Sequence, residues 1–162
     1  MKTIWKNPKT FFVLLATTLI TGTVLTSCDN DDDIDNTNQM YTLSGNASGS
    51  QEIPTNAATG TATLTGSYNK STNSLSYTIN WTGLSNIVTA AHFHGPASTT
   101  ETASPLVDIT IGTNGVSGNT SGTVTVSDAV ESALLDGKIY YNIHTALYPN
   151  GEIRSQVVAT QH

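Results

Sequence analysis

The sequence of 162 residues has few charged side chains, and very few basic ones in its main part. Charged residues make up 11% of the chain. All twelve acidic residues lie after Cys28, where only Lys70, Lys138 and Arg154 are basic. Twelve acidic against three basic residues give this part a formal charge of −9, which repels nucleic acid and anionic lipid. We therefore expect no nucleic-acid partner.

Cysteine and catalytic motifs are also scarce. Cys28 is the single cysteine, so the chain cannot form an internal disulfide and has no CxxC pair. The sequence has no Ser/His/Asp spacing, no glycine-rich phosphate loop and no metalloprotease helix. Glu52 and Glu152 are too far apart in the sequence to be recognised as a carboxylate pair. These absences make an enzyme the weaker of the function classes.

What the chain does have begins with an apolar run at residues 11–25, which follows three lysines. The run is too short for a stable membrane span and ends in small residues, which predicts a signal peptide over 1–27. Residues 25–28, LTSC, resemble a bacterial lipobox, in which the cysteine thiol carries lipid. A leftover free cysteine in an ordinary signal peptide is the alternative. We expect lipidation at Cys28 and a membrane anchor made by its acyl chains.

Residues 28–39 form an acidic linker, in which DNDDDIDNTNQ follows Cys28 and Ile34 is the single large apolar residue. Such a segment cannot bury enough surface to fold, so it should be a solvated tether. Its acidic start also resembles the signal by which some Gram-negative bacteria send lipoproteins to the cell surface. A plain soluble linker fits equally well. The expected location is the cell envelope of a Gram-negative bacterium, as an outer-membrane lipoprotein, with surface exposure as one alternative.

From Met40 onward the chain is rich in Thr, Ser, Gly and β-branched residues that alternate with period two. This pattern predicts an all-β domain over 40–160, an antiparallel β sandwich or Greek-key-like barrel. The expected strands are 40–47, 60–68, 74–82, 86–94, 105–111, 120–126, 138–145 and 152–159. One segment, SDAVESALLDG, predicts a short helical turn near 128–136, capped by Ser127 and ended by Gly137.

Five stretches of this domain share the order and spacing of one known family. They are SGSQEIP (48–54), TGTATLT (59–65), AAHFHGPA (90–97), LLDGKIYYNIHT (134–145) and YPNGEIRSQV (148–157). Over residues 41–158 the chain resembles the CHRD domain, a module named after chordin. It departs from the common family pattern at Ser155 and at Thr55. The resemblance implies an extracytoplasmic β domain that contributes to binding, and it implies no particular enzymatic reaction.

Two of the four histidines, His92 and His94, are two residues apart on one expected strand and so share a face. The same alternation puts His144 on the polar face of the strand 138–145. A turn at 146–151 should return the chain antiparallel beside it, with Glu152 and Arg154 on the side of His144. These five side chains are therefore expected on a common polar face, with Glu152 orienting a histidine and Arg154 pairing with Glu152.

Three interpretations of this face remain open. The histidines and the Glu/Arg pair can form a hydrogen-bond network that pins the turn and the register. Alternatively, His92, His94 and His144 can bind a copper or zinc ion, since neutral imidazole is a common ligand of both. In the third interpretation the face binds a protein or glycan partner, with aromatic contacts from Trp81, Tyr140 and Tyr148.

The sequence thus predicts a membrane-anchored CHRD-domain lipoprotein that acts as a binding or structural module. The alternative is a copper- or zinc-binding protein that uses His92, His94 and His144, with weak metal-dependent enzymatic activity. His162 is left out of the candidate site because it lies at a chain terminus that is expected to fray.

Overall fold

A computed structural model describes residues 39–112 and 114–162 of the chain. The predicted signal peptide, Cys28 and nearly all of the acidic linker lie outside the described residues. The strands are Met40–Ser48 (β1), Thr61–Asn69 (β2), Ser74–Thr82 (β3), Val88–His94 (β4), Pro105–Asp108 (β5), Gly118–Thr125 (β6), Tyr140–Thr145 (β7), Ile153–Gln156 (β8) and Val158–Gln161 (β9). A 3₁₀ turn (η2) spans Gly49–Gln51 and a helix (α1) spans Asp128–Leu135. Neither helix is long and apolar enough to cross a membrane.

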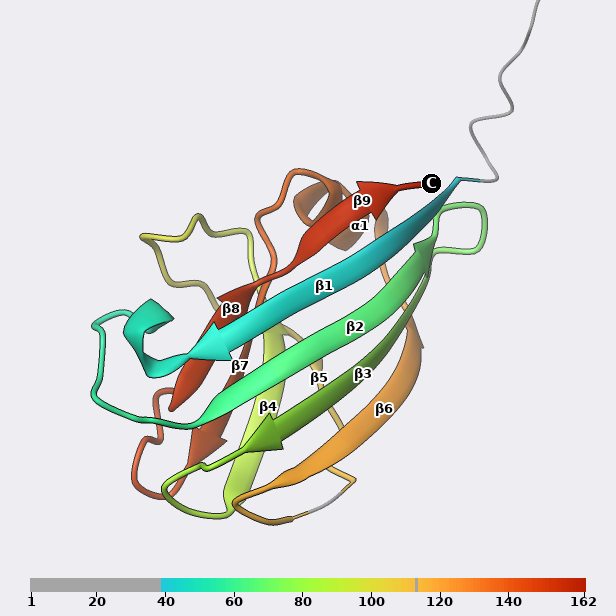
Figure 1. The fold of residues 1–162 in the computed structure, drawn as a ribbon. Coiled ribbons are helices and arrows are strands. Elements are labelled where there is room, and N and C mark those ends of the chain that lie inside the picture. Colours follow the sequence, from blue (N-terminus) through green and yellow to red (C-terminus); the bar gives the residue numbers. More distant parts are fainter. Residues whose placement is uncertain (1–38, 113) are drawn as a thin grey trace, which may run out of the picture. The chain divides into compact units, whose positions relative to one another are not determined.

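The strands form one antiparallel sheet in the order β5-β4-β7-β8-β1-β2-β3-β6, and β9 pairs with β1 beside β8. The sheet curls into a half-barrel around a single core (Figure 1). The all-β antiparallel fold with one short helix is therefore confirmed. A single curled sheet can enclose its core in this way because twist accumulates from strand to strand.

The alternation of β1, β2 and β3 explains which face became the core. In β2, Ala62 and Leu64 point inward and are buried, while Thr61, Thr63 and Thr65 are exposed. Burial of each large aliphatic side chain contributes roughly 1.5–3 kcal/mol to folding. A shift of one residue in register would expose this apolar set, so the hydrophobic pattern specifies the pairing.

Helix α1 covers one end of the core with the buried side chains of Val130 and Leu134. Gly137 follows the helix with a φ of 68°, the left-handed conformation expected for a residue that ends a helix. Ser127 stands at the N-cap as predicted, but its side chain makes no capping hydrogen bond. The helix is held by its apolar side rather than by its cap.

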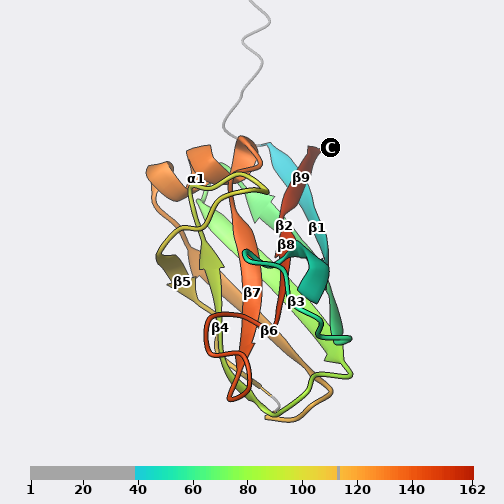
Figure 2. The ribbon, with the colours of Figure 1, turned by 90° about the vertical axis from the view of Figure 1, so that its left-hand side faces the viewer.

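The strands β4, β7 and β8 lie side by side and carry most of the site residues predicted from the sequence (Figure 2). Their inner face carries core residues such as Phe93 and Ile143. Their outer face carries polar side chains that are also largely buried, because the loops 49–59 and 95–104 fold over it. A polar face that is covered in this way must satisfy its hydrogen bonds internally.

Candidate functional site

Three histidines meet on the outer face of β4 and β7. His92 and His94 share that face of β4, and His144 stands on β7 diagonally across from His92. The ring centroid of His92 lies 5.4 Å from that of His94 and 5.0 Å from that of His144. One candidate ligand atom from each of the three lies within 4.8 Å of the others. The expected convergence of these side chains is therefore present in the structure.

The outer nitrogen of His144 is fixed by the backbone. Its Nδ1 lies 3.0 Å from the carbonyl oxygen of Pro149 and donates a hydrogen bond to it. The opposite nitrogen, Nε2, then carries the lone pair and faces Nδ1 of His92 at 3.1 Å. The turn at 146–151 thus sets the tautomer of His144 and directs its free nitrogen toward His92.

His94 is the most buried of the three, with 6% of its surface exposed. Its Nδ1 lies 2.9 Å from the carbonyl oxygen of Ala103, and its Nε2 lies 3.0 Å from Oδ1 of Asn142. A backbone carbonyl on one ring nitrogen is the usual way in which a protein orients a metal-binding imidazole. The loop 95–104 supplies this carbonyl, so the loop both covers His94 and holds its ring.

A stack of three side chains runs across the strands. The Tyr140 ring stacks on His94 with 4.8 Å between centroids and an interplanar angle of 4°. The guanidinium of Arg154 lies 3.5 Å from the centroid of the same Tyr140 ring. Arg154 also donates hydrogen bonds to the carbonyl oxygens of Ser98 and Glu101. The arginine therefore anchors the covering loop and supports His94 through one aromatic ring.

The site favours the neutral forms of His94 and His144. Burial lowers the pKa of His94, and the nearby His92 and Arg154 act in the same direction, against the hydrogen bonds to Ala103 and Asn142. Burial also lowers the pKa of His144, and His92 and His94 lower it further against the hydrogen bond to Pro149. A neutral imidazole keeps one lone pair, which is the form that binds a transition metal. The site thus offers nitrogen lone pairs at close range and disfavours adjacent imidazolium charges.

Glu152 does not belong to this cluster, and the expectation that it orients a histidine is wrong. Its carboxylate accepts hydrogen bonds from the backbone N–H and hydroxyl of Ser85 and from the hydroxyl of Thr145. Glu152 lies in a bend before β8, which begins at Ile153, so the strand alternation does not extend to it. The expected pairing of Arg154 with Glu152 is wrong for the same reason. Arg154 interacts electrostatically with a different acid, Glu52.

The site includes buried residues that the sequence pattern did not single out. Asn142 alternates with His144 on β7, so its position on this face followed from the strand pattern, but its contact with His94 did not. Glu52 lies in the irregular loop 49–59, where no periodicity indicates which side chain turns inward. Two aromatic residues considered as partner contacts, Trp81 and Tyr140, are buried, whereas Tyr148 is half-buried.

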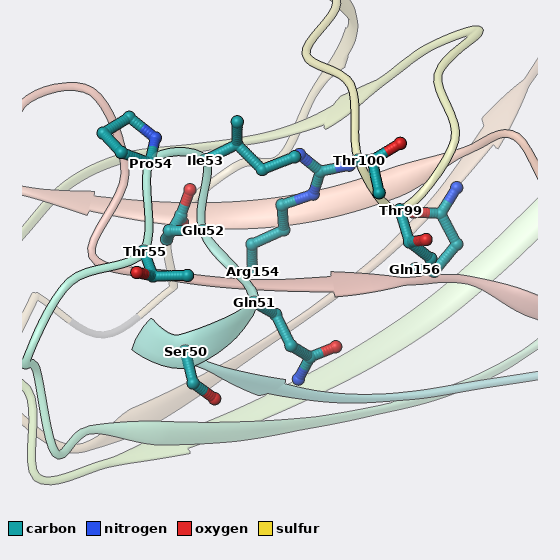
Figure 3. A pocket seen from close by; sticks show the side chains of 10 residues that line it. All are labelled: Ser50, Gln51, Glu52, Ile53, Pro54, Thr55, Thr99, Thr100, Arg154 and Gln156. Carbon is teal, nitrogen blue, oxygen red and sulfur yellow. The ribbon is translucent and has the colours of Figure 1, made fainter.

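A pocket of about 540 Å³ opens beside this network, between the loop 49–59 and the covering loop 95–104. Arg154 and Glu52 contribute to its wall from β8 and from the residues after η2, and Thr99 and Thr100 line the opposite side (Figure 3). Arg154 connects the pocket with the histidine cluster, because it lines the pocket and also lies over the Tyr140 ring.

The architecture defines an all-β antiparallel domain, with most of its buried polar residues on or beside the outer face of β4, β7 and β8. The model of the CHRD domain matches residues 43–157, which is most of the chain. The protein therefore belongs to the CHRD family, as the sequence motifs predicted. A search of curated proteins found no match, and neither did a search of solved structures.

Proposed function

We propose that this protein is an extracytoplasmic binding module whose ligand is a single copper or zinc ion held by His92, His94 and His144. The observation that carries the proposal is the convergence of three imidazole ligand atoms within 4.8 Å. Backbone carbonyls hold the outer nitrogens of two of these rings. Imidazole nitrogen suits both zinc and copper, and neither ion needs a carboxylate in addition.

The geometry is close to that of a bound ion. Two nitrogens at the usual zinc distance stand about 3.3 Å apart in a tetrahedral site. Nδ1 of His92 and Nε2 of His144 are already 3.1 Å apart. The ligand atom of His94 lies within 4.8 Å of the other two and would have to move closer to them to reach the same spacing. Three protein ligands would leave one position open, as in sites that exchange ligands.

The competing interpretation is a hydrogen-bond network without metal, in which His92 donates to His144. Calorimetric titration of the tag-free protein with Cu²⁺ and Zn²⁺ separates the two. We expect one ion per chain in the parent and a large loss of affinity in His92→Ala, His94→Ala, His144→Ala and the triple variant. His162→Ala is the matched control, because that exposed histidine lies outside the cluster. If the parent binds neither ion more tightly than the triple variant, the metal proposal fails.

We further propose that lipid on Cys28 anchors the module to the cell envelope, as an outer-membrane lipoprotein. The support is the lipobox-like LTSC at the end of the apolar run. Two or three acyl chains would supply stable binding, whereas one chain gives only marginal attachment. Cys28→Ser should leave the protein as a precursor or release it into the soluble fraction. Unchanged processing and membrane recovery of that variant would contradict the anchor.

A further inference from the structure

The buried carboxyl group of Glu52 is linked to the histidine cluster through Asn142. Glu52 is only 6% exposed, and within the described residues its Oε1 has no hydrogen-bond partner of normal geometry. It lies beside the side-chain amide of Asn142, which in turn contacts His94. A Cβ at Gly151 would lie 2.6 Å from Oε1 of Glu52 and 2.5 Å from Nδ2 of Asn142. A glycine at this position is what allows the acid and the amide to approach each other.

The hydrogen bonds of His94 decide how this amide must be oriented. With Oδ1 of Asn142 toward His94, both ring nitrogens face oxygen atoms, one from Asn142 and one from Ala103. A neutral imidazole has a single N–H and cannot donate to both. The doubly protonated ring could, but it would place a charge on a side chain that is only 6% exposed and packed against the ring of His92.

A half-turn of the amide resolves the conflict. Rotation of the Asn142 amide by half a turn exchanges its oxygen and nitrogen without moving other atoms, and hydrogen bonding decides between the two orientations. Nδ2 of Asn142 then donates to Nε2 of His94, whose Nδ1 donates to Ala103. The oxygen of the amide is left facing Glu52. Only a neutral carboxyl can donate to that oxygen, and the donation would give Oε1 the partner that it lacks.

The environment of Glu52 favours the neutral carboxyl. Burial raises its pKa to about 7, and this outweighs the charge of Arg154 and the contacts with Asn142 and the backbone of Ile53, which lower it. Arg154, on β8, is the charged side chain that interacts with this carboxyl among the described residues. At neutral pH a large part of the protein therefore carries the acid in its protonated form.

We propose that Glu52 is a positioning residue of the histidine site: its carboxyl donates to Asn142, Asn142 donates to Nε2 of His94, and this relay keeps that nitrogen free of a proton. The inference rests on the proposed metal site. The relay would leave Nε2 of His94 with a free lone pair, so that an ion could bind there without first displacing a proton. An incoming ion takes the place of the weaker Asn142 donor. The loop 49–59 would then act on the metal site without touching the ion.

The first test needs no metal. ¹⁵N NMR of the histidines in the metal-free, tag-free full chain in detergent, at pH 6, should show the proton of His94 on Nδ1 and a bare Nε2. A proton on Nε2 in the parent overturns the relay. Glu52→Gln keeps an N–H donor toward Asn142 and should preserve this tautomer, whereas Glu52→Ala should shift His94 toward the Nε2–H form. An unchanged tautomer in a folded Glu52→Ala protein also overturns it.

Asn142→Leu serves if Glu52→Ala does not fold, since an aliphatic side chain cannot donate to Nε2 and His94 should shift toward the Nε2–H form. The second test is Cu²⁺ and Zn²⁺ affinity. Loss of a group that orients a metal ligand typically weakens metal binding about 10- to 100-fold, which is the drop expected for Glu52→Ala. Equal affinity in Glu52→Ala contradicts the positioning role.

The two proposals fail separately. A parent that binds no metal removes the proposed function, while the tautomer of His94 still decides whether the relay exists. A parent that binds metal with a protonated Nε2 in its metal-free form keeps the metal site and removes the relay.

Discussion

The guanidinium of Arg154 lies 3.5 Å from the centroid of the Tyr140 ring. The same ring stacks on His94, so a cation on β8 is joined to a candidate metal ligand on β4 through one side chain of β7. Arg154 and Tyr140 are almost fully buried, and the guanidinium also donates hydrogen bonds to two carbonyl oxygens of the covering loop. The arrangement depends on a planar cation with several donors, which lysine cannot reproduce.

Arg154→Lys should therefore lower the free energy of unfolding by about 2 kcal/mol, because at least one charge-assisted hydrogen bond and the stacking are lost. Urea denaturation measures the change. Lys138→Ala is the matched control, since its exposed ion pair with Asp136 is expected to contribute under about 1 kcal/mol. Equal stability of Arg154→Lys and the parent would show that the stack does not hold the loop.

Glu152→Gln should reduce the stability of the fold without changing metal binding. The carboxylate is fully buried and accepts hydrogen bonds from Ser85 and Thr145, so an NH₂ group in place of one oxygen leaves at least one donor unpaired. We expect a loss of roughly 1–3 kcal/mol in unfolding free energy. Copper and zinc affinity of the folded variant should be unchanged. A selective loss of metal affinity would instead restore Glu152 to the histidine site.

Gly151→Ala should destabilise the protein more than Gly137→Ala. Both glycines have positive φ values, which cost an L-residue roughly 1–2 kcal/mol. At Gly137 the added Cβ meets nothing within 4 Å, whereas at Gly151 it would collide with Glu52 and Asn142. Thermal unfolding of the two variants measures the difference. Equal losses would mean that the acid and the amide can move apart freely.

The pH dependence of stability should reveal Glu52. Its pKa rises from 4.5 to about 7 on folding, so the stabilisation is complete below about 4.5 and is lost as the pH rises through about 7. The full shift corresponds to about 3 kcal/mol. Glu52→Gln cannot ionise, so its stability relative to the parent should increase by up to that amount between pH 5 and pH 8. The contributions of the other titratable groups are common to both proteins and cancel in this difference.

A parallel pH dependence in parent and variant would show that Glu52 has an ordinary pKa. Chemical denaturation at each pH provides the values. Asp136→Asn, which removes an exposed carboxyl, is the control for the general effect of removing one negative charge.

Regular alternation made most of this site predictable. On β7 the two-residue period correctly put Tyr140, Asn142 and His144 on one face, and on β4 it did so for His92 and His94. The prediction failed at Glu152, because this residue lies in a bend before β8, where the two-residue period no longer holds. Glu52 was beyond reach, since its inward direction depends on a loop that folds over β8 and on space left by Gly151. Such contacts arise from tertiary packing between distant segments, which a local pattern does not encode.

The pairing of β1 with β9 has a consequence for the order in which the molecule assembles. Thr42 and His162 are hydrogen-bonded although 120 residues separate them, and β1 also pairs with β8. A chain that emerges from its N-terminus first can form the β1–β2–β3 hairpins early, but one edge of β1 stays bare until the last residues arrive. Contacts between such distant segments make folding slow. Even a short C-terminal deletion that removes β9 would leave residues 41–44 of β1 without a partner along that edge, and exposed strand edges can pair with another copy of the chain.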